Sequence, residues 1–495
     1  MSEPNSYDAV PYESLPFAHT HPARLAAVAA LFGLAPPAVE TARVLELGCA
    51  AGGNLAPMAE AFPQARFVGV DYSARQIADG TALLAAAGIT NVELKHASIT
   101  DIGPEFGTFD YIVCHGVFSW VPRDVQDAIL RVCGRHLAPG GVAYVSYNTY
   151  PGWHFRGAVR DMMRYHALRF DEPTERVAQA RALLAFLARA TQKDAGAFGA
   201  LVRSEHELLS DQSDHYLFHE QLEDVNEPLY FHQFAARAAA SGLCYLGEAQ
   251  VSTMVVGNFG ADVAQQLGEL ASDQIQLEQY LDFVRNRTFR QTLLVRSSES
   301  PDPTIAPARV RALHVACPGK QTGRAVDVAS FATARFQSRS GMALAVTAPF
   351  LKAALFELVS AWPGTVPFAE LCERAAARLN RAHTEADIDA LAVGLLNAYL
   401  SSDLIEFWAA PITFAREAGA KPVALSHARV RAAAGHDTVS NRRHEVERLG
   451  TLPLQLLPLL DGTRDRAALG AAVSTTPDEL EAALRALASA ALLAA

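Results

Sequence analysis

One stretch near the N-terminus, Arg43–Asn54, limits the folds open to this chain more than any other part of the sequence. It reads R-V-L-E-L-G-C-A-A-G-G-N. Its apolar residues predict a short buried strand, and its glycines predict a tight turn that opens a helix. Such a turn is typical of a nucleotide-cofactor site, because glycine lets the backbone approach the ligand and the helix N-terminus offers free N–H groups. The sequence therefore predicts an α/β fold with a cofactor bound at this turn.

The residues inside the turn argue against a dinucleotide. A G-x-G-x-x-G fingerprint needs glycine where this chain has Ala50, and only the outer pair, Gly48 and Gly53, is kept. A pyrophosphate would lie against the backbone at Ala50, where the methyl group obstructs it. With Glu46 in the end of the strand, the pattern E-x-G-x-A-x-G resembles the first motif of class I S-adenosylmethionine-dependent methyltransferases. A nicotinamide or flavin protein and a non-catalytic relative are the alternatives.

The next segments continue an alternation of strands and helices. Ser73 is placed to cap a helix over Ala74–Ala87. The segment R-H-L-A-P-G-G, Arg135–Gly141, resembles the turn before the fifth strand of class I methyltransferases. The second to fifth strands are predicted at Phe67–Val70, Val92–Lys95, Tyr111–Cys114 and Val142–Tyr147. Leu243–Leu246 and Phe289–Val295 are read as the sixth and seventh strands, an antiparallel hairpin that closes a seven-stranded Rossmann-like sheet.

Several residues around this sheet are expected to bind the cofactor. Asp71 ends the second strand, where a carboxylate fits both hydroxyl groups of a ribose. The resemblance implies that the loop at Gly48 wraps the methionine part of S-adenosylmethionine and that Ser98 and Ile99 cover its adenine. The full expected set is Tyr12, Phe17, Glu46, Gly48, Cys49, Ala50, Gly53, Asn54, Asp71, Tyr72, Gln76, Ser98, Ile99, His115, Gly116 and Val117.

The stretch after the fifth strand is the candidate acceptor site. Ligands of an open α/β sheet lie beyond the carboxyl ends of its strands, so Asn148–His154 would face the methyl group. Methyl transfer is an in-line displacement that depends on positioning and desolvation. An aromatic wall with a carbonyl or hydroxyl group orients an amine, and the residues expected to do so are Tyr147, Asn148, Tyr150 and Trp153. The alternative is a Pro-Gly turn whose aromatic residues pack in a core.

Composition narrows the class of protein further. The chain has 495 residues, about three domains by length, and a net charge of −11 that disfavours nucleic acid and anionic membranes as partners. Six scattered cysteines without a C-x-x-C pair fit a reducing cytoplasm, and no signal peptide or membrane-spanning run is present. His215, His219 and Glu220 lack the H-E-x-x-H arrangement, so no metal is predicted.

The chain divides by pattern into six parts. The last part, residues 349–495, has the pattern of a winged helix, a module that binds DNA or docks proteins. Its single basic pair, Arg442-Arg443, is followed by acidic residues, so protein docking is favoured over DNA binding. The parts are an N-terminal arm and helix (1–42), a cofactor-binding core (43–154), a helical insertion that is a lid or a dimer contact (155–224), a segment that completes the sheet (225–300), a linker with short strands (301–348) and a winged-helix-like region (349–495). In the arm, Tyr12, Phe17 and His21 could fold over the cofactor, and surface packing is the alternative.

Four segments together resemble bacterial methyltransferases that carry a methyltransferase regulatory domain. They are P-Y-E-S-L-P-F-A-H-T-H-P, E-L-G-C-A-A-G-G-N, Y-N-T-Y-P-G-W and H-E-Q-L-E-D-V-N-E-P-L-Y-F-H-Q-F. Some members of that family are rickettsial protein-lysine methyltransferases. The resemblance implies a homodimer, S-adenosylmethionine as cofactor and a protein acceptor such as lysine. A small-molecule methyltransferase and a non-enzymatic sensor of the cofactor are the rival functions.

Overall fold

The fold is built on a mixed sheet in the order β3-β2-β1-β4-β5-β7-β6. The structure is a computed structural model that describes residues 13–494. β1 to β5 run parallel, and β7 runs antiparallel to both β5 and β6. The strands are β1 (Arg43–Leu47), β2 (Arg66–Asp71), β3 (Val92–His96), β4 (Phe109–Cys114), β5 (Leu137–Asn148), β6 (Leu243–Glu248) and β7 (Phe289–Arg296). Every strand predicted for this sheet is present.

Two details differ from the prediction. The L-A-P-G-G segment is part of β5 and does not form a turn before it; the pairing of β5 with β4 changes register there, between Phe109 and Tyr111. β6 and β7 pair antiparallel as expected but are not a hairpin, because residues 249–288 lie between them. That connection contains helices α11 (Ala261–Leu270) and α12 (Gln274–Arg285).

The side chains of β1 alternate between two hydrophobic cores, one on each face of the sheet. Val44 packs with α2 (Pro22–Leu31), α3 (Leu55–Ala61) and α4 (Ala74–Ala87). Leu45 and Leu47 pack with α5 (Arg123–His136) and α10 (Phe231–Ala240) on the opposite face. The predicted cap of α4 is confirmed, since Ser73 Oγ accepts a hydrogen bond from the backbone N–H of Gln76 at 3.1 Å. The strand and turn of the opening motif are thereby fixed from both sides.

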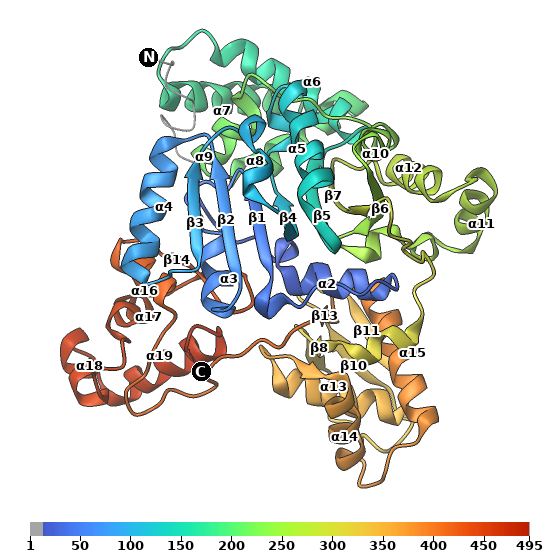
Figure 1. The fold of residues 1–495 in the computed structure, drawn as a ribbon, viewed down its shortest axis with the longest axis vertical. Coiled ribbons are helices and arrows are strands. Elements are labelled where there is room, and N and C mark those ends of the chain that lie inside the picture. The colour runs from blue at the N-terminus through green and yellow to red at the C-terminus, as the bar shows by residue number, and fades with distance from the viewer. Residues whose placement is uncertain (1–12, 495) are drawn as a thin grey trace.

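The helical insertion has a core of its own. It consists of α6 (Gly152–Ala167), α7 (Pro173–Ala190), α8 (Ala197–Ser210), α9 (Asp214–Leu217) and a π-helical turn over Phe218–Leu222. Figure 1 shows these helices gathered at the upper end of the molecule, on the opposite side from the two C-terminal units.

The C-terminal third forms two further units, each with its own core. The first follows a 3₁₀ turn over Pro307–Ala312, and its first short strand begins at His314, within the range 301–348 expected to hold short strands. Its elements are β8 (His314–Ala316), β9 (Lys320–Thr322), β10 (Ala334–Gln337), β11 (Ala343–Val346), α13 (Pro349–Ala361), β12 (Val366–Pro367), α14 (Phe368–Arg378), α15 (Glu385–Ser401) and β13 (Glu406–Trp408). The second has α16 (Ser426–Ala433), β14 (Thr438–Ser440), β15 (Val446–Arg448), α17 (Thr451–Leu456), α18 (Arg466–Val473) and α19 (Pro477–Ser489) (Figure 1).

Among the described helices, none is long and apolar enough to cross a membrane.

Candidate active site

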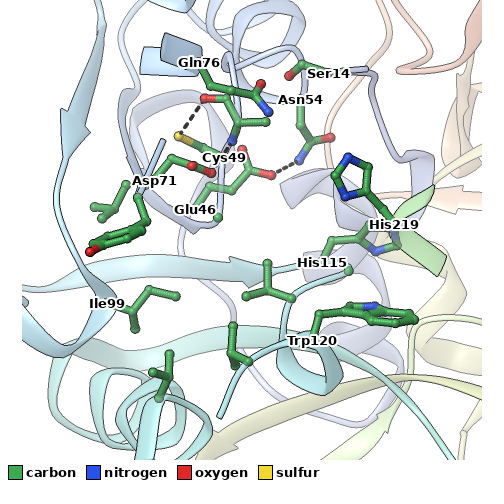
Figure 2. A pocket seen from close by; sticks show the side chains of 18 of the residues that line it. Ser14, Glu46, Cys49, Asn54, Asp71, Gln76, Ile99, His115, Trp120 and His219 are labelled. Atoms are coloured by element: carbon green, nitrogen blue, oxygen red, sulfur yellow. Dashed lines mark hydrogen bonds between the residues drawn. The ribbon is translucent and has the colours of Figure 1, made fainter. Parts of the chain in front are cut away.

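A cavity of about 980 Å³ opens where the parallel strands end. Its walls come from the N-terminal arm, the loops after β1 to β5 and the helical insertion (Figure 2). Sixteen of the residues expected at the site line it: Phe17, Glu46, Gly48, Cys49, Ala50, Asn54, Asp71, Tyr72, Gln76, Ser98, Ile99, His115, Gly116, Val117, Asn148 and Trp153. The expectation for Tyr12 falls outside the described residues.

The turn after β1 is held by Asp71. The Asp71 Oδ2 accepts a hydrogen bond from the backbone N–H of Ala50 at 2.8 Å, and Oδ1 accepts one from Ser73 N–H at 2.9 Å. Ala50 lies in the left-handed region, at φ +48°, a conformation that costs an alanine about 1–2 kcal/mol. Asp71 thus shapes the turn, and it also lines the cavity.

Glu46 presents an unsatisfied buried oxygen atom to the same cavity. The side chain is 3% exposed, and Oε1 accepts a hydrogen bond from Asn54 Nδ2 at 2.8 Å (Figure 2). Its Oε2 is buried without a hydrogen-bond partner within residues 13–494. Burial raises the pKa of Glu46 to about 8, against the opposing effect of the bond from Asn54 and with a smaller contribution from the charge of Asp71. A buried acid of this kind suits a cationic ligand, whose charge would favour the ionised carboxylate.

Asn54 joins the cofactor motif to the last domain of the chain. Its Oδ1 accepts hydrogen bonds from the backbone N–H of Phe17 at 2.9 Å and from His444 Nε2 at 2.7 Å. His444 is 390 residues away in the sequence and is buried. Since Oδ1 is the acceptor, the carboxamide nitrogen must face Glu46. The N-terminal arm and the C-terminal unit therefore set the orientation of Asn54 together, and with it the position of Glu46.

The N-terminal arm is fixed over the cavity by the same unit. Arg431 donates a hydrogen bond to the backbone carbonyl of Ser14 at 3.3 Å, and Thr438 Oγ1 donates one to Glu13 at 3.2 Å. The aromatic ring of Phe17 lies 3.8 Å from that of His115. Glu13, Ser14 and Leu15 line the cavity in addition to Phe17.

Two of the residues expected at the site, Gly53 and His21, lie away from the lining of the cavity. Gly53 does not line the cavity; its backbone N–H donates to Ser14 Oγ at 2.7 Å, and a Cβ at this position would lie 2.1 Å from the Ser14 carbonyl oxygen. It therefore holds the arm. His21 is not part of a lid, because its buried ring lies 5.1 Å from the Trp408 ring and 5.4 Å from the His444 ring. It packs between the sheet and the C-terminal units.

The acceptor residues separate into two groups. Asn148 lines the cavity, and its Nδ2 donates to Asn226 Oδ1 at 3.0 Å, so its side-chain Oδ1 remains for a ligand. Trp153 also lines the cavity, 3% exposed, with a buried Nε1 that has no hydrogen-bond partner in the described chain. These two residues are placed where an acceptor would enter.

Tyr147 and Tyr150 lie outside the cavity. Tyr147 points into the core, because side chains alternate along β5: its ring stacks on Phe234 at 4.1 Å and its hydroxyl lies 3.1 Å from Thr292 Oγ1. Tyr150 stacks on His154 at 3.9 Å, away from the lining. Both side chains pack as the alternative of structural aromatic residues describes.

The sequence pattern did not reveal the rest of the acceptor end. Trp120 follows β4, and four further residues come from the helical insertion: Arg156, Tyr216, His219 and Glu220. Figure 2 shows Trp120 and His219 on the side of the cavity opposite Asp71 and Gln76. In the sequence, His219 and Glu220 suggest only metal ligation, and the described residues contain no group of three His, Cys, Asp or Glu side chains that could hold a metal ion. Their position beside the sheet could be found only from the tertiary fold.

The strand order, the acid in β1, Asp71 at the end of β2 and the lining cavity define a class I S-adenosylmethionine-dependent methyltransferase. The comparisons with known proteins agree. Residues 45–143 match the methyltransferase domain, residues 213–296 the methyltransferase regulatory domain, and residues 420–492 the PKMT C-terminal winged helix domain. The chain belongs to the family of bacterial methyltransferases that combine these domains.

Three relatives illustrate the family. An uncharacterised protein of Rickettsia prowazekii, RP789, is 41% identical over 77% of this chain and 69% of its own length. A second, RP028 of the same organism, is 43% identical over 47% of this chain and 93% of its own. The structure of PKMT2 from Rickettsia typhi, also solved in complex with AdoHcy, has a TM-score of 0.88 at 29% identity, over 98% of this chain and all of that one. The similarity therefore covers the C-terminal units as well as the catalytic fold.

Proposed function

We propose that this enzyme transfers a methyl group from S-adenosylmethionine to the side-chain amine of lysine in a protein. The observation that carries the proposal is the two-part cavity. Its volume of about 980 Å³ is at the upper end of the roughly 300–1,000 Å³ typical of ligand sites, which leaves room for an acceptor side chain beside the cofactor. The match to PKMT2 over the whole chain supports a protein acceptor.

The residues at the cofactor end have separable roles in this proposal. Asp71 holds the ribose, and the unpaired Glu46 Oε2 faces the cationic methionine part. Ser98 and Ile99 lie against the adenine, and His115 with Phe17 covers the cofactor on the arm side. Burial lowers the pKa of His115 to about 3, so its ring is neutral and adds no charge beside the sulfonium. When bound, the cofactor supplies an electrophilic methyl group.

At the acceptor end, the side-chain Oδ1 of Asn148 orients the amine by accepting a hydrogen bond from one of its N–H groups. Trp120 and Trp153 exclude water from the same end. Positioning of this kind is sufficient for an in-line displacement, because charge is moved from sulfur to nitrogen and none is created. The helical insertion supplies one wall of this end and therefore acts as a lid.

The same insertion is proposed to join two copies of the chain. Large apolar side chains of the insertion are exposed, among them Phe155, Tyr165, Leu168, Phe186 and Phe198. An exposed apolar set of this size on helices is typical of a protein interface. A homodimer in the cytoplasm is the arrangement we expect, and light scattering of the purified protein against a Phe186→Glu variant measures it: the variant should be monomeric.

Transfer of radiolabelled methyl groups into a bacterial lysate tests the function. The lysate is separated into protein and small-molecule fractions, and a second protein sample is acetylated beforehand so that its lysine amines are blocked. Label in protein bands that acetylation abolishes supports the proposal. Label only in the small-molecule fraction would instead indicate a metabolite methyltransferase, and label that survives acetylation would indicate another side chain.

A further inference from the structure

The acceptor end contains a carboxyl group to which the proposed function gives no role. Glu220 lies on the π-helical turn over Phe218–Leu222 and lines the cavity. π-Helical turns are rare and are frequent at functional sites. Within residues 13–494 its carboxyl group accepts no hydrogen bond and forms no ion pair at contact distance. A carboxylate facing a cavity in this way lacks the partner that buried acids in proteins usually have.

The charged and titratable groups around Glu220 come from four elements. Arg156 and Arg160 lie on α6, Tyr216 lies on α9, and His219 is its neighbour on the π-helical turn. Glu205 of α8 is buried and forms an ion pair with Arg156 at 3.4 Å. Burial raises the pKa of Glu220 to about 7, although the positive charges of Arg156, His219 and Arg160 act in the opposite direction. Near neutral pH the group can therefore gain and lose a proton.

Two unpaired N–H donors lie at the same end. Trp153 Nε1 and Arg156 Nη2 are buried without a hydrogen-bond partner in the described structure, and Arg156 lies over the Trp153 ring at 5.1 Å. Both residues line the cavity. Unpaired buried donors are costly and indicate that a ligand with acceptor atoms completes them. One acid and two donors are the complement of a lysine within a polypeptide, which brings an ammonium group and carbonyl oxygens.

We propose that Glu220 binds the ε-ammonium of the incoming lysine and accepts one of its protons before methyl transfer, while Trp153 Nε1 and Arg156 hold carbonyl oxygens of the substrate backbone. This inference rests on the proposed function and adds a catalytic residue to it. Glu220 is the group that converts a bound lysine into a nucleophile.

The step is balanced without any further reactant. One ammonium N–H bond breaks and its proton joins the Glu220 carboxylate. The freed nitrogen lone pair then forms the N–C bond as the C–S bond breaks, and the sulfur keeps the bonding electron pair as a neutral thioether. The product is a methylammonium cation, and the proton on Glu220 leaves to solvent.

The proton transfer is reasonable in energy because the site lowers the pKa of the amine. A free lysine amine has a pKa of about 10.4. Removal from water and the adjacent sulfonium both favour the neutral amine. Asn148 Oδ1 accepts a hydrogen bond from the amine and thereby orients its lone pair toward the methyl group.

The test is the pH dependence of methyl transfer by Glu220→Gln, with Glu207→Gln as the matched control. Glu207 is exposed on α8 of the same insertion, so the Glu207→Gln substitution removes the same charge at a position outside the cavity. The probe is the lysate protein fraction used above, at a concentration where rate is proportional to kcat/KM. At pH 7 the Glu220→Gln rate should fall at least about 30-fold, and the deficit should narrow toward pH 9.5 as solvent deprotonates the amine. The Kd for S-adenosylmethionine should stay within about twofold of wild type.

Two results would overturn the inference: a Glu220→Gln rate equal to that of Glu207→Gln, or a loss of the same factor at every pH, as a structural role would give. Glu220→Asp provides a second test, because it keeps a carboxyl group and should have a higher rate at pH 7 than Glu220→Gln. Trp153→Phe, which removes only the indole N–H, should raise the KM for protein about three- to tenfold and leave the pH profile unchanged. If wild type itself labels no lysine, the proposed function fails and not this assignment alone.

Discussion

The two ends of the cavity are built in different ways. The cofactor end is formed mainly by the arm and by loops that directly follow β1 to β4, and Asp71 and Asn54 there are already bonded to the backbone or to a neighbouring side chain. Its one buried oxygen atom without a partner in the described residues is Glu46 Oε2. The acceptor end combines residues from the β4 and β5 loops with a separate helical insertion, and several of its polar atoms have no partner within the described residues. The first end is preorganised for one ligand, and the second is completed by its substrate.

This difference indicates which end of the cavity determines specificity for the methyl acceptor. A preorganised site can be shared by methyltransferases of many substrates, because every member binds the same cofactor. Unsatisfied buried donors and acids cost stability in the absence of ligand and therefore have to be explained by what binds there. The acceptor end is accordingly the part of the cavity that distinguishes this enzyme.

The largest expected effect is at the cofactor end. Asp71→Ala removes the carboxylate that holds Ala50 and, in our proposal, the ribose. Loss of two charge-assisted hydrogen bonds should weaken S-adenosylmethionine binding at least about 100-fold and abolish methyl transfer. Isothermal titration measures the affinity. Asp79→Ala, an exposed acid on α4, serves as the control and should bind as wild type does. Unchanged affinity in Asp71→Ala would remove the ribose assignment.

A substitution at the acceptor end should lower turnover and leave cofactor affinity nearly unchanged. Asn148→Ala is expected to lower kcat about 10- to 100-fold and to leave the cofactor Kd within about twofold, because the side chain orients only the amine. Tyr150→Phe is the matched variant from the same loop and should keep wild-type turnover, since Tyr150 lies outside the cavity. Steady-state rates and titration together separate the two effects. Equal losses in both variants would contradict the placement of the acceptor.

The sequence predicted the cofactor end well because its signals are local. Glycines, the acid in β1 and Asp71 act within a strand and the turn that follows it, so their spacing alone indicates the sheet and the cofactor. All seven strands of the sheet and the Ser73 cap are where these patterns placed them.

The acceptor end and the interdomain contacts depend on packing, which local patterns do not encode. Glu220 is near Trp153 only because α6 and the π-helical turn pack together, and His444 meets Asn54 across 390 residues. Tyr147 was misplaced for a related reason. Its aromatic side chain suits an acceptor wall as well as a core, and only the direction of its position in β5 decides between them.

The pH dependence of cofactor binding tests the role of Glu46 at the cofactor end. The pKa of Glu46 is raised to about 8 in the protein, so the ligand-free fold should lose stability at this group as pH rises from about 4.5 through about 8. A bound cation favours the ionised form, so cofactor affinity should rise over the same range and binding should release a proton. Calorimetry in two buffers of different ionisation enthalpy measures that proton. Glu46→Gln should abolish the release, and release that persists in this variant would assign the proton to another group.

The smallest expected effect tests whether the C-terminal unit belongs functionally to the cofactor end. His444 donates to Asn54 Oδ1, and Asn54 in turn donates to Glu46. His444→Ala removes this donor and leaves Oδ1 bonded to the backbone N–H of Phe17, so the carboxamide is held less firmly. The KM for S-adenosylmethionine should rise about three- to tenfold while kcat stays near wild type, because the groups that touch the acceptor are unchanged. His436→Ala, an exposed histidine of the same unit, is the control. A fall in kcat without a change in KM would show that the C-terminal unit acts on the acceptor end instead, and the division of the cavity into two independent ends would then not hold.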